Sequence, residues 1–173
     1  MPERTGVPIF GAPFFVASTF SLNQTHQTKA ISERHPHMRL IAILEDDTRR
    51  IADMQSAATV LSECEFCFFS DAHEMTTWLA SNLERVSLLS LDCDLDATWL
   101  AGVECGSGEN VTAFLAQYAR KLPIIIHSSN ALRAPAMHME LVLAGCSSVM
   151  LCPFVDGQRW GMDVSKALNS RRS

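Results

Sequence analysis

The chain has 173 residues, of which 47% are hydrophobic and 19% are charged, and its net charge is −5. This composition is typical of a globular domain with an apolar core, whereas an acidic chain is a poor match for duplex nucleic acid, which binds clustered Lys and Arg. No apolar run reaches the ~20 residues of a membrane span, so we expect a cytoplasmic protein with neither a membrane nor duplex DNA as its partner.

Residues 1–37 form a first segment without a regular hydrophobic period. Its apolar stretch 7–22 contains two prolines, and the residues before it carry no net positive charge, which argues against a signal peptide. The segment ends in the polar sequence "NQTHQTKAISERHPH". We therefore predict a flexible leader over 1–37, followed by one domain over 38–170.

From residue 38 onward, strand-like and helix-like segments alternate. The run "MRLIAIL" at 38–44 is continuously apolar, as in a strand buried on both faces of a parallel sheet, whereas 48–63 repeats apolar residues at helical spacing. The predicted elements are strands 38–44, 65–70, 86–92, 123–128 and 147–152, which alternate with helices 48–63, 71–82, 109–121, 132–145 and 156–170. Such a series predicts an α/β fold with a doubly wound, five-stranded parallel sheet, in the flavodoxin-like order 2-1-3-4-5.

Acidic side chains follow the first and third predicted strands. Glu45 and Asp46 come after strand one, and Asp92 and Asp94 come at the end of strand three. In the order 2-1-3-4-5 these strands are neighbours, and ligands bind at the carboxyl edge where the strand order reverses. Converging carboxylates need compensation, which Mg²⁺ (or Mn²⁺) supplies while keeping positions open for phosphate oxygens. We predict that all four residues are metal ligands. Asp92 has an alternative role as the nucleophile that takes up a phosphoryl group.

A second polar group follows the fourth predicted strand. We predict His127 as a general acid/base or phosphate donor, and the alternative is a histidine at the edge of the core. Ser128 and Asn130 are predicted to bind phosphate oxygens. Arg133, at the start of the next helix, is predicted to pair with an anionic ligand, or otherwise with Glu140 or solvent.

Two of the six cysteines form a CxxC motif inside a predicted strand. Because side chains alternate along a strand, Cys64 and Cys67 point to opposite faces and are poorly placed to chelate zinc. We expect the cysteines to be small buried hydrophobic residues in a reducing compartment.

These motifs resemble the receiver domain of two-component response regulators over residues 38–170. "ILEDD" is similar to its acidic pair, and "LLSLD" is similar to the strand that leads to the phosphoaccepting aspartate, here Asp92. The resemblance implies that the backbone carbonyl of Asp94 binds the metal and that Ser128 is the switch residue. "AGCSSVMLCPF" resembles the strand that ends in Lys-Pro-Phe, with Cys152 in place of the lysine that pairs with the phosphorylated aspartate.

Other features are more similar to one offshoot of receivers, the cyclic-phosphate-processing receiver domains. Members of that family carry Leu-Asp-His-Asp-Leu after the third strand and His-Ser-x-Asn after the fourth. They also have a glycine at the start of the third helix and a methionine in the helix after the Asn. In this chain "LDCDL" has Cys93 in place of the histidine, whereas "HSSN", Gly108 and Met137 match.

The resemblance implies a metal-dependent cyclic phosphodiesterase or phosphotransferase that acts on a phosphorylated small molecule or a cyclic-phosphate end. One alternative is a stand-alone receiver that is phosphorylated on Asp92 and works through a protein partner of a signalling pathway. Another is a degenerate receiver that only binds such a partner. A Glu after one strand and a DxD after a later one also fit topoisomerase-primase-like chemistry, which the "HSSN" motif and the acidic charge fit less well.

Overall fold

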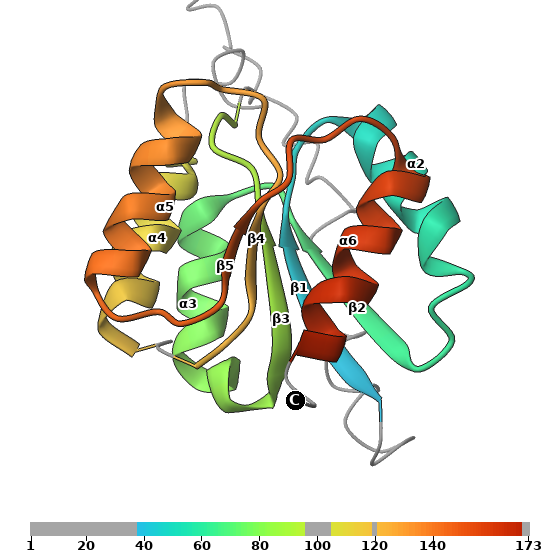
Figure 1. Cartoon of the computed structure of the whole chain (residues 1–173), viewed down its shortest axis with the longest axis horizontal. Helices are drawn as coiled ribbons and strands as arrows, with labels where there is room; N and C mark the ends of the chain where they lie inside the picture. The colour runs from blue at the N-terminus through green and yellow to red at the C-terminus, as the bar shows by residue number, and fades with distance from the viewer. Residues whose placement is uncertain (1–37, 96–104, 119–120, 171–173) are drawn as a thin grey trace, which may run out of the picture. The chain divides into compact units, whose positions relative to one another are not determined.

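The computed structural model describes residues 38–95, 105–118 and 121–170 (Figure 1). The chain divides into the units Met1–Pro36 and His37–Ser173, and the described elements belong to the second unit. The predicted leader over 1–37 lies outside the described residues and stays a prediction. Within the described residues, no helix is long and apolar enough to cross a membrane.

Strands and α-helices alternate through the described part of the chain in the predicted order. The elements are β1 (Arg39–Leu44), α2 (Thr48–Ala58), β2 (Cys64–Phe69), α3 (Ala72–Asn82), the 3-10 helix η1 (Leu83–Arg85), β3 (Val86–Leu91), α4 (Gly108–Tyr118), β4 (Ile124–Ile126), α5 (Arg133–Leu143), β5 (Val149–Leu151) and α6 (Gly157–Asn169). Helix α2 ends at Ala58, before the predicted residue 63. The Thr59 hydroxyl donates to the Ser56 carbonyl oxygen at 2.7 Å, and this bond satisfies one of the last carbonyls of the helix.

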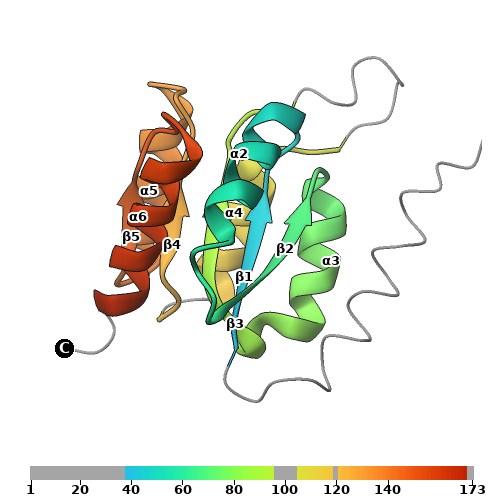
Figure 2. The same cartoon turned by 90° about the vertical axis from the view of Figure 1, so that its right-hand side faces the viewer.

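The five strands form one parallel sheet in the order β2-β1-β3-β4-β5, which confirms the predicted flavodoxin-like topology. Figure 2 shows the strands side by side in this order. Helices α3, α4 and α5 cover one face of the sheet, and α2 and α6 cover the other (Figure 1). The strand order reverses between β1 and β3, so the carboxyl ends of these two strands flank the switch point.

The strand residues alternate between two hydrophobic cores, one on each face of the sheet. In β1, Leu40 and Ala42 pack under α3, α4 and α5, whereas Ile41 and Ile43 pack under α2 and α6. A fully buried Leu or Ile contributes about 1.5–3 kcal/mol relative to an exposed one, so this double burial fixes the strand register. The CxxC cysteines also separate as predicted, with Cys67 against the first core and Cys64 against the second.

Two helix starts lie at the carboxyl edge of the sheet. The Asp47 side chain caps α2 and accepts hydrogen bonds from the backbone N–H groups of Arg49 and Arg50 at 2.8 and 3.2 Å. These backbone donors, from Arg50 first and then Arg49, lower the pKa of Asp47 below its usual value. Helix α4 starts against β3, where a Cβ on Gly108 would lie 2.1 Å from the Asp92 carbonyl oxygen. Only glycine permits this close approach.

Candidate functional site

Three carboxylates converge where β1 and β3 end. Leu44 and Leu91 are register partners, and the backbone N–H of Asp92 donates to the Leu44 carbonyl oxygen at 3.0 Å. One carboxylate oxygen from each of Glu45, Asp46 and Asp92 lies within 4.8 Å of the other two. The parallel sheet therefore joins two acidic segments that are more than forty residues apart in the chain.

The two buried carboxylates of this acidic cluster are oriented by backbone donors. Glu45 is 0% exposed, and its Oε1 accepts the N–H groups of Asp46 and Asp47 at 3.0 and 2.9 Å. Asp92 is 1% exposed, and its Oδ1 accepts the N–H of Cys93 at 2.8 Å. In both side chains one oxygen is thus bound to the backbone, and the other, Glu45 Oε2 or Asp92 Oδ2, faces the shared space.

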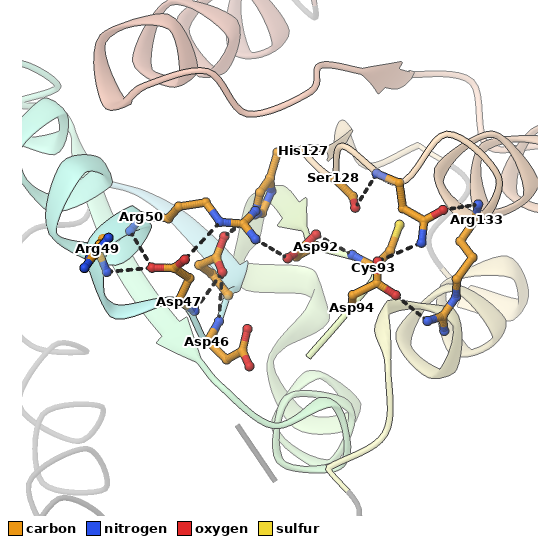
Figure 3. Close-up of polar contacts among 12 residues, drawn as sticks. Asp46, Asp47, Arg49, Arg50, Asp92, Cys93, Asp94, His127, Ser128 and Arg133 are labelled. Atoms are coloured by element: carbon orange, nitrogen blue, oxygen red, sulfur yellow. Dashed lines mark hydrogen bonds and ion pairs between the residues drawn. The ribbon is translucent and has the colours of Figure 1, made fainter. Parts of the chain in front are cut away.

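The guanidinium of Arg50 occupies part of that shared space. Its Nη2 donates to Asp92 Oδ2 at 3.1 Å, and its Nη1 lies 3.3 Å from Glu45 Oε2 (Figure 3). The Arg50 Cζ lies 5.8 Å from the centroid of the Phe154 ring, within the range of a cation–π contact. Sequence reasoning missed Arg50. Its place three residues after the cap Asp47, on the first turn of the helix at this edge, was the available signal.

His127 contacts the acidic cluster through Glu45. The ring is 0% exposed, and its Nε2 lies 3.3 Å from Glu45 Oε2. Its Nδ1 lies 2.8 Å from Ser90 Oγ. The same oxygen accepts a hydrogen bond from the indole N–H of Trp160 at 3.0 Å. Sequence reasoning missed Ser90 and Trp160, although a serine inside an apolar strand, two residues before Asp92, marks a polar contact on the buried face.

Asp94, Asn130 and Arg133 form a separate rim beside the cluster. Asp94 accepts from the Asn130 side-chain amide at 2.8 Å and pairs with Arg133 Nη1. Arg133 Nε and Nη2 donate to the two carboxylate oxygens of Glu109, both at 2.9 Å. Its pairing is therefore with acidic side chains of the rim, and Glu140 is not the partner in these contacts. The hydrogen bond from Arg133 lowers the pKa of Glu109, and the hydrogen bond to Glu109 raises the pKa of Arg133.

Asn130 and Ser128 also shape the loop that follows β4. Asn130 Oδ1 accepts the backbone N–H groups of Leu132 and Arg133 at 3.1 and 3.0 Å, which satisfies two donors at the start of α5. Ser128 Oγ accepts the Asn130 N–H at 3.2 Å, and Ser128 is 5% exposed. Figure 3 shows Ser128 between the Asp92 side and the Arg133 side of the site. The predicted phosphate-binding roles of Ser128, Asn130 and Arg133 stay predictions.

The sequence profile of the family described as "Cyclic-phosphate processing Receiver domain" matches residues 41–142, more than half of the chain. The chain belongs to the cyclic-phosphate processing receiver domain family. No curated protein matches it closely enough to count as a relative.

Solved receiver domains share the fold of this family member. A signal receiver domain from Vibrio parahaemolyticus is 15% identical, with a TM-score of 0.57 over 78% of this chain and 93% of that one. The receiver domain of a Pseudomonas aeruginosa sensor histidine kinase is 17% identical (TM-score 0.54, 77% and 96% covered), and it was solved with magnesium coordinated in its active-site cleft. A phosphorylated cyanobacterial phytochrome response regulator is 16% identical (TM-score 0.55, 77% and 92%). At these identities the likeness establishes the fold.

In this cyclic-phosphate processing receiver domain, Cys93 stands between Asp92 and Asp94. The side chain is buried, its Sγ lies 3.1 Å from Met137 Sδ, and burial raises the pKa of the thiol. Cys93 is therefore a neutral thiol near neutral pH and packs into the core under α5. Burial likewise raises the pKa of the Cys152 thiol, after β5. A thiol carries no positive charge, and the cation that contacts Asp92 in the structure is Arg50 on α2.

Proposed function

We propose that this receiver domain binds a divalent metal ion at Glu45, Asp46 and Asp92 and processes a cyclic phosphate there. The supporting observation is that two buried carboxylates each turn one oxygen toward a common space, next to a guanidinium. Hard divalent cations such as Mg²⁺ or Mn²⁺ prefer carboxylate oxygens, so the donor set fits. When bound, such an ion supplies positive charge to the oxygens of a phosphate.

The local charge supports a site that holds both Arg50 and a divalent ion. The cluster holds three carboxyl groups and one guanidinium, so the acidic groups outnumber the basic one by two, and the charge of a divalent cation matches that difference. Arg50 has five N–H donors; Nη1 faces Glu45, Nη2 faces Asp92 and Nε lies 3.9 Å from Asp47 Oδ2, which leaves N–H groups of the two Nη atoms unused in these contacts. With its side chain 28% exposed, the guanidinium offers the remaining donors to phosphate oxygens from solvent.

Asp92 takes the central place in this proposal. Its Oδ2 is the buried carboxylate oxygen nearest to Arg50, and it serves either as a metal ligand or as the nucleophile. As the nucleophile it would form an acyl phosphate while one ring P–O bond breaks and the released ester oxygen takes a proton from solvent, and water would then hydrolyse the acyl phosphate. The side chain of Asp94 is held by Asn130 and Arg133, and the part of Asp94 that we propose for the metal is its backbone carbonyl, as in receiver domains. For Asn130 and Arg133 to bind phosphate, they exchange Asp94 and Glu109 for phosphate oxygens when the ligand arrives.

The second candidate function is signalling through a phosphorylated Asp92 and a protein partner. The receiver fold and the position of Asp92 at the end of β3 favour it. Treatment with acetyl phosphate and Mg²⁺ separates the two proposals. A stable phosphoaspartate with altered NMR shifts supports signalling, and an unchanged spectrum argues against it.

Hydrolysis of 2′,3′-cyclic nucleotides with Mg²⁺ or Mn²⁺ tests the first proposal. We expect turnover to be lost in Asp92→Asn and kept in Asp53→Asn, which makes the same change at an exposed position on α2. Turnover that survives Asp92→Asn refutes the proposed site. If the unmodified protein shows no turnover and Asp92 becomes phosphorylated, the signalling function is supported instead.

A further inference from the structure

A buried chain of hydrogen bonds runs from helix α6 to the acidic cluster. Trp160 Nε1 donates to Ser90 Oγ at 3.0 Å, and Ser90 Oγ lies 2.8 Å from His127 Nδ1. His127 Nε2 lies 3.3 Å from Glu45 Oε2. Trp160 is 3% exposed and the other three residues are 0% exposed, so water does not substitute for any of these partners.

The two ends of this chain determine the direction of each hydrogen bond. An indole N–H only donates, so Ser90 Oγ accepts at that contact. At the other end, Glu45 Oε1 accepts two backbone N–H groups and Oε2 lies 3.3 Å from Arg50 Nη1, so both oxygens of the side chain act as acceptors. The ring nitrogen that faces it, Nε2, must therefore carry the hydrogen. In a neutral ring Nδ1 is then the acceptor, and it takes the single hydroxyl hydrogen of Ser90.

We infer that Ser90 and Trp160 are positioning residues that hold His127 in its Nε2–H form, so that the ring donates to Glu45 and fixes Oε2 in the site. In the opposite tautomer the bare Nε2 would face a carboxylate oxygen, so two lone pairs would meet and Nε2 would have no donor, whereas Oε2 would keep only its contact with Arg50. The ring is enclosed, and within the described part of the chain it contacts the acidic cluster through Glu45. Its Nε2 already carries a hydrogen, so it does not remove a proton at that atom. His127 thus acts as a positioning residue.

The hydrogen-bond assignment stands on the contacts alone, whereas its consequence for the site rests on the proposed function. Partners one bond removed from a metal ligand fix its orientation, and their loss typically weakens metal binding about 10–100-fold. His127 is the direct partner of Glu45, and Trp160 is two hydrogen bonds further away. We therefore expect its substitution to weaken metal binding less, by about threefold to tenfold.

The experiment uses the full chain, labelled with ¹⁵N, and reads the His127 ring by long-range ¹H–¹⁵N correlation at neutral pH. We expect a single Nε2–H tautomer in the unmodified protein. Trp160→Phe keeps a ring against Phe66, whose centroid lies 6.0 Å away, and removes the N–H. This variant and Ser90→Ala are expected to lose the single tautomer. Trp78→Phe makes the same change on α3, against Phe69, and is expected to leave it unchanged.

A calorimetric titration with Mn²⁺ on the same four proteins reads the consequence. We expect weaker binding in Trp160→Phe and Ser90→Ala, and unchanged binding in Trp78→Phe. An Nδ1–H or doubly protonated ring in the unmodified protein, or an undisturbed Nε2–H ring in both variants, overturns the inference. A changed tautomer with unchanged affinity overturns the positioning role. If the unmodified protein binds no Mn²⁺, the proposed function fails, and the NMR result alone decides the hydrogen-bond assignment.

Discussion

Gly108→Ala is expected to destabilise the domain because it forces α4 away from β3. A Cβ at this position would lie 2.1 Å from the Asp92 carbonyl oxygen, whereas ordinary contacts begin at 3.4 Å. The helix start must therefore move by more than 1 Å or break the bond from its own N–H to the Cys93 carbonyl oxygen, now 3.0 Å long. Overpacking of this kind costs about 1–3 kcal/mol, and loss of the buried hydrogen bond adds about 1 kcal/mol.

Gly161→Ala in α6 is the matched control, because its Cβ would lie 3.5 Å from the Ala57 Cβ, an ordinary contact. That change is expected to stabilise the protein by roughly 0.5–1 kcal/mol, the usual advantage of Ala over Gly inside a helix. Urea unfolding followed by circular dichroism measures both free energies of unfolding. If the two variants agree within about 0.5 kcal/mol, the close approach of α4 to Asp92 is refuted.

Three further predictions follow from the site. Arg50→Gln removes the positive charge beside Glu45 and Asp92, which repels a metal ion there. We expect the Mn²⁺ affinity to rise about tenfold, which corresponds to ~1.4 kcal/mol of relieved repulsion. Calorimetry compares this variant with Arg49→Gln at the exposed neighbouring position, and equal affinities contradict the prediction. Asp47 has a pKa in the fold that is lowered from its usual 3.8, so its capping contribution of about 1 kcal/mol is fully present above that value and is lost progressively as pH falls from 3.8 through the lower folded pKa; the difference in unfolding free energy between Asp47→Ala and the unmodified protein should shrink over that range. Cys93 is expected to resist alkylation until the protein unfolds, and rapid labelling of the native protein, located by mass spectrometry, would contradict its burial.

The sequence predicts the sheet because its signals there are local and repeated. Apolar runs at each strand and the rule for parallel crossovers are enough to predict a doubly wound parallel sheet, and the order β2-β1-β3-β4-β5 is the one that flavodoxin-like sheets have. In that order Glu45, Asp46 and Asp92 are expected to converge, because they follow the ends of two neighbouring strands.

Contacts made by helical side chains are harder to predict, because they depend on how each helix is rotated over the sheet. Arg50 and Arg49 are neighbours in α2, yet only the rotation of the helix decides which of them reaches Asp92. Trp160 reads as a core residue in the pattern of α6, and its N–H finds Ser90 only once α6 is packed. Asp94 is adjacent to the site in sequence, but its rotamer joins it to Asn130 and Arg133.

The position of a bound metal ion tests the central claim most directly. Crystals of the full chain grown with Mn²⁺ and measured for anomalous scattering should show one peak bounded by the carboxylates of Glu45, Asp46 and Asp92. The peak should disappear in crystals of Asp92→Asn and persist in those of Asp53→Asn. Absence of a peak at this cluster in the unmodified protein, or a peak only at another group of residues, would contradict the account.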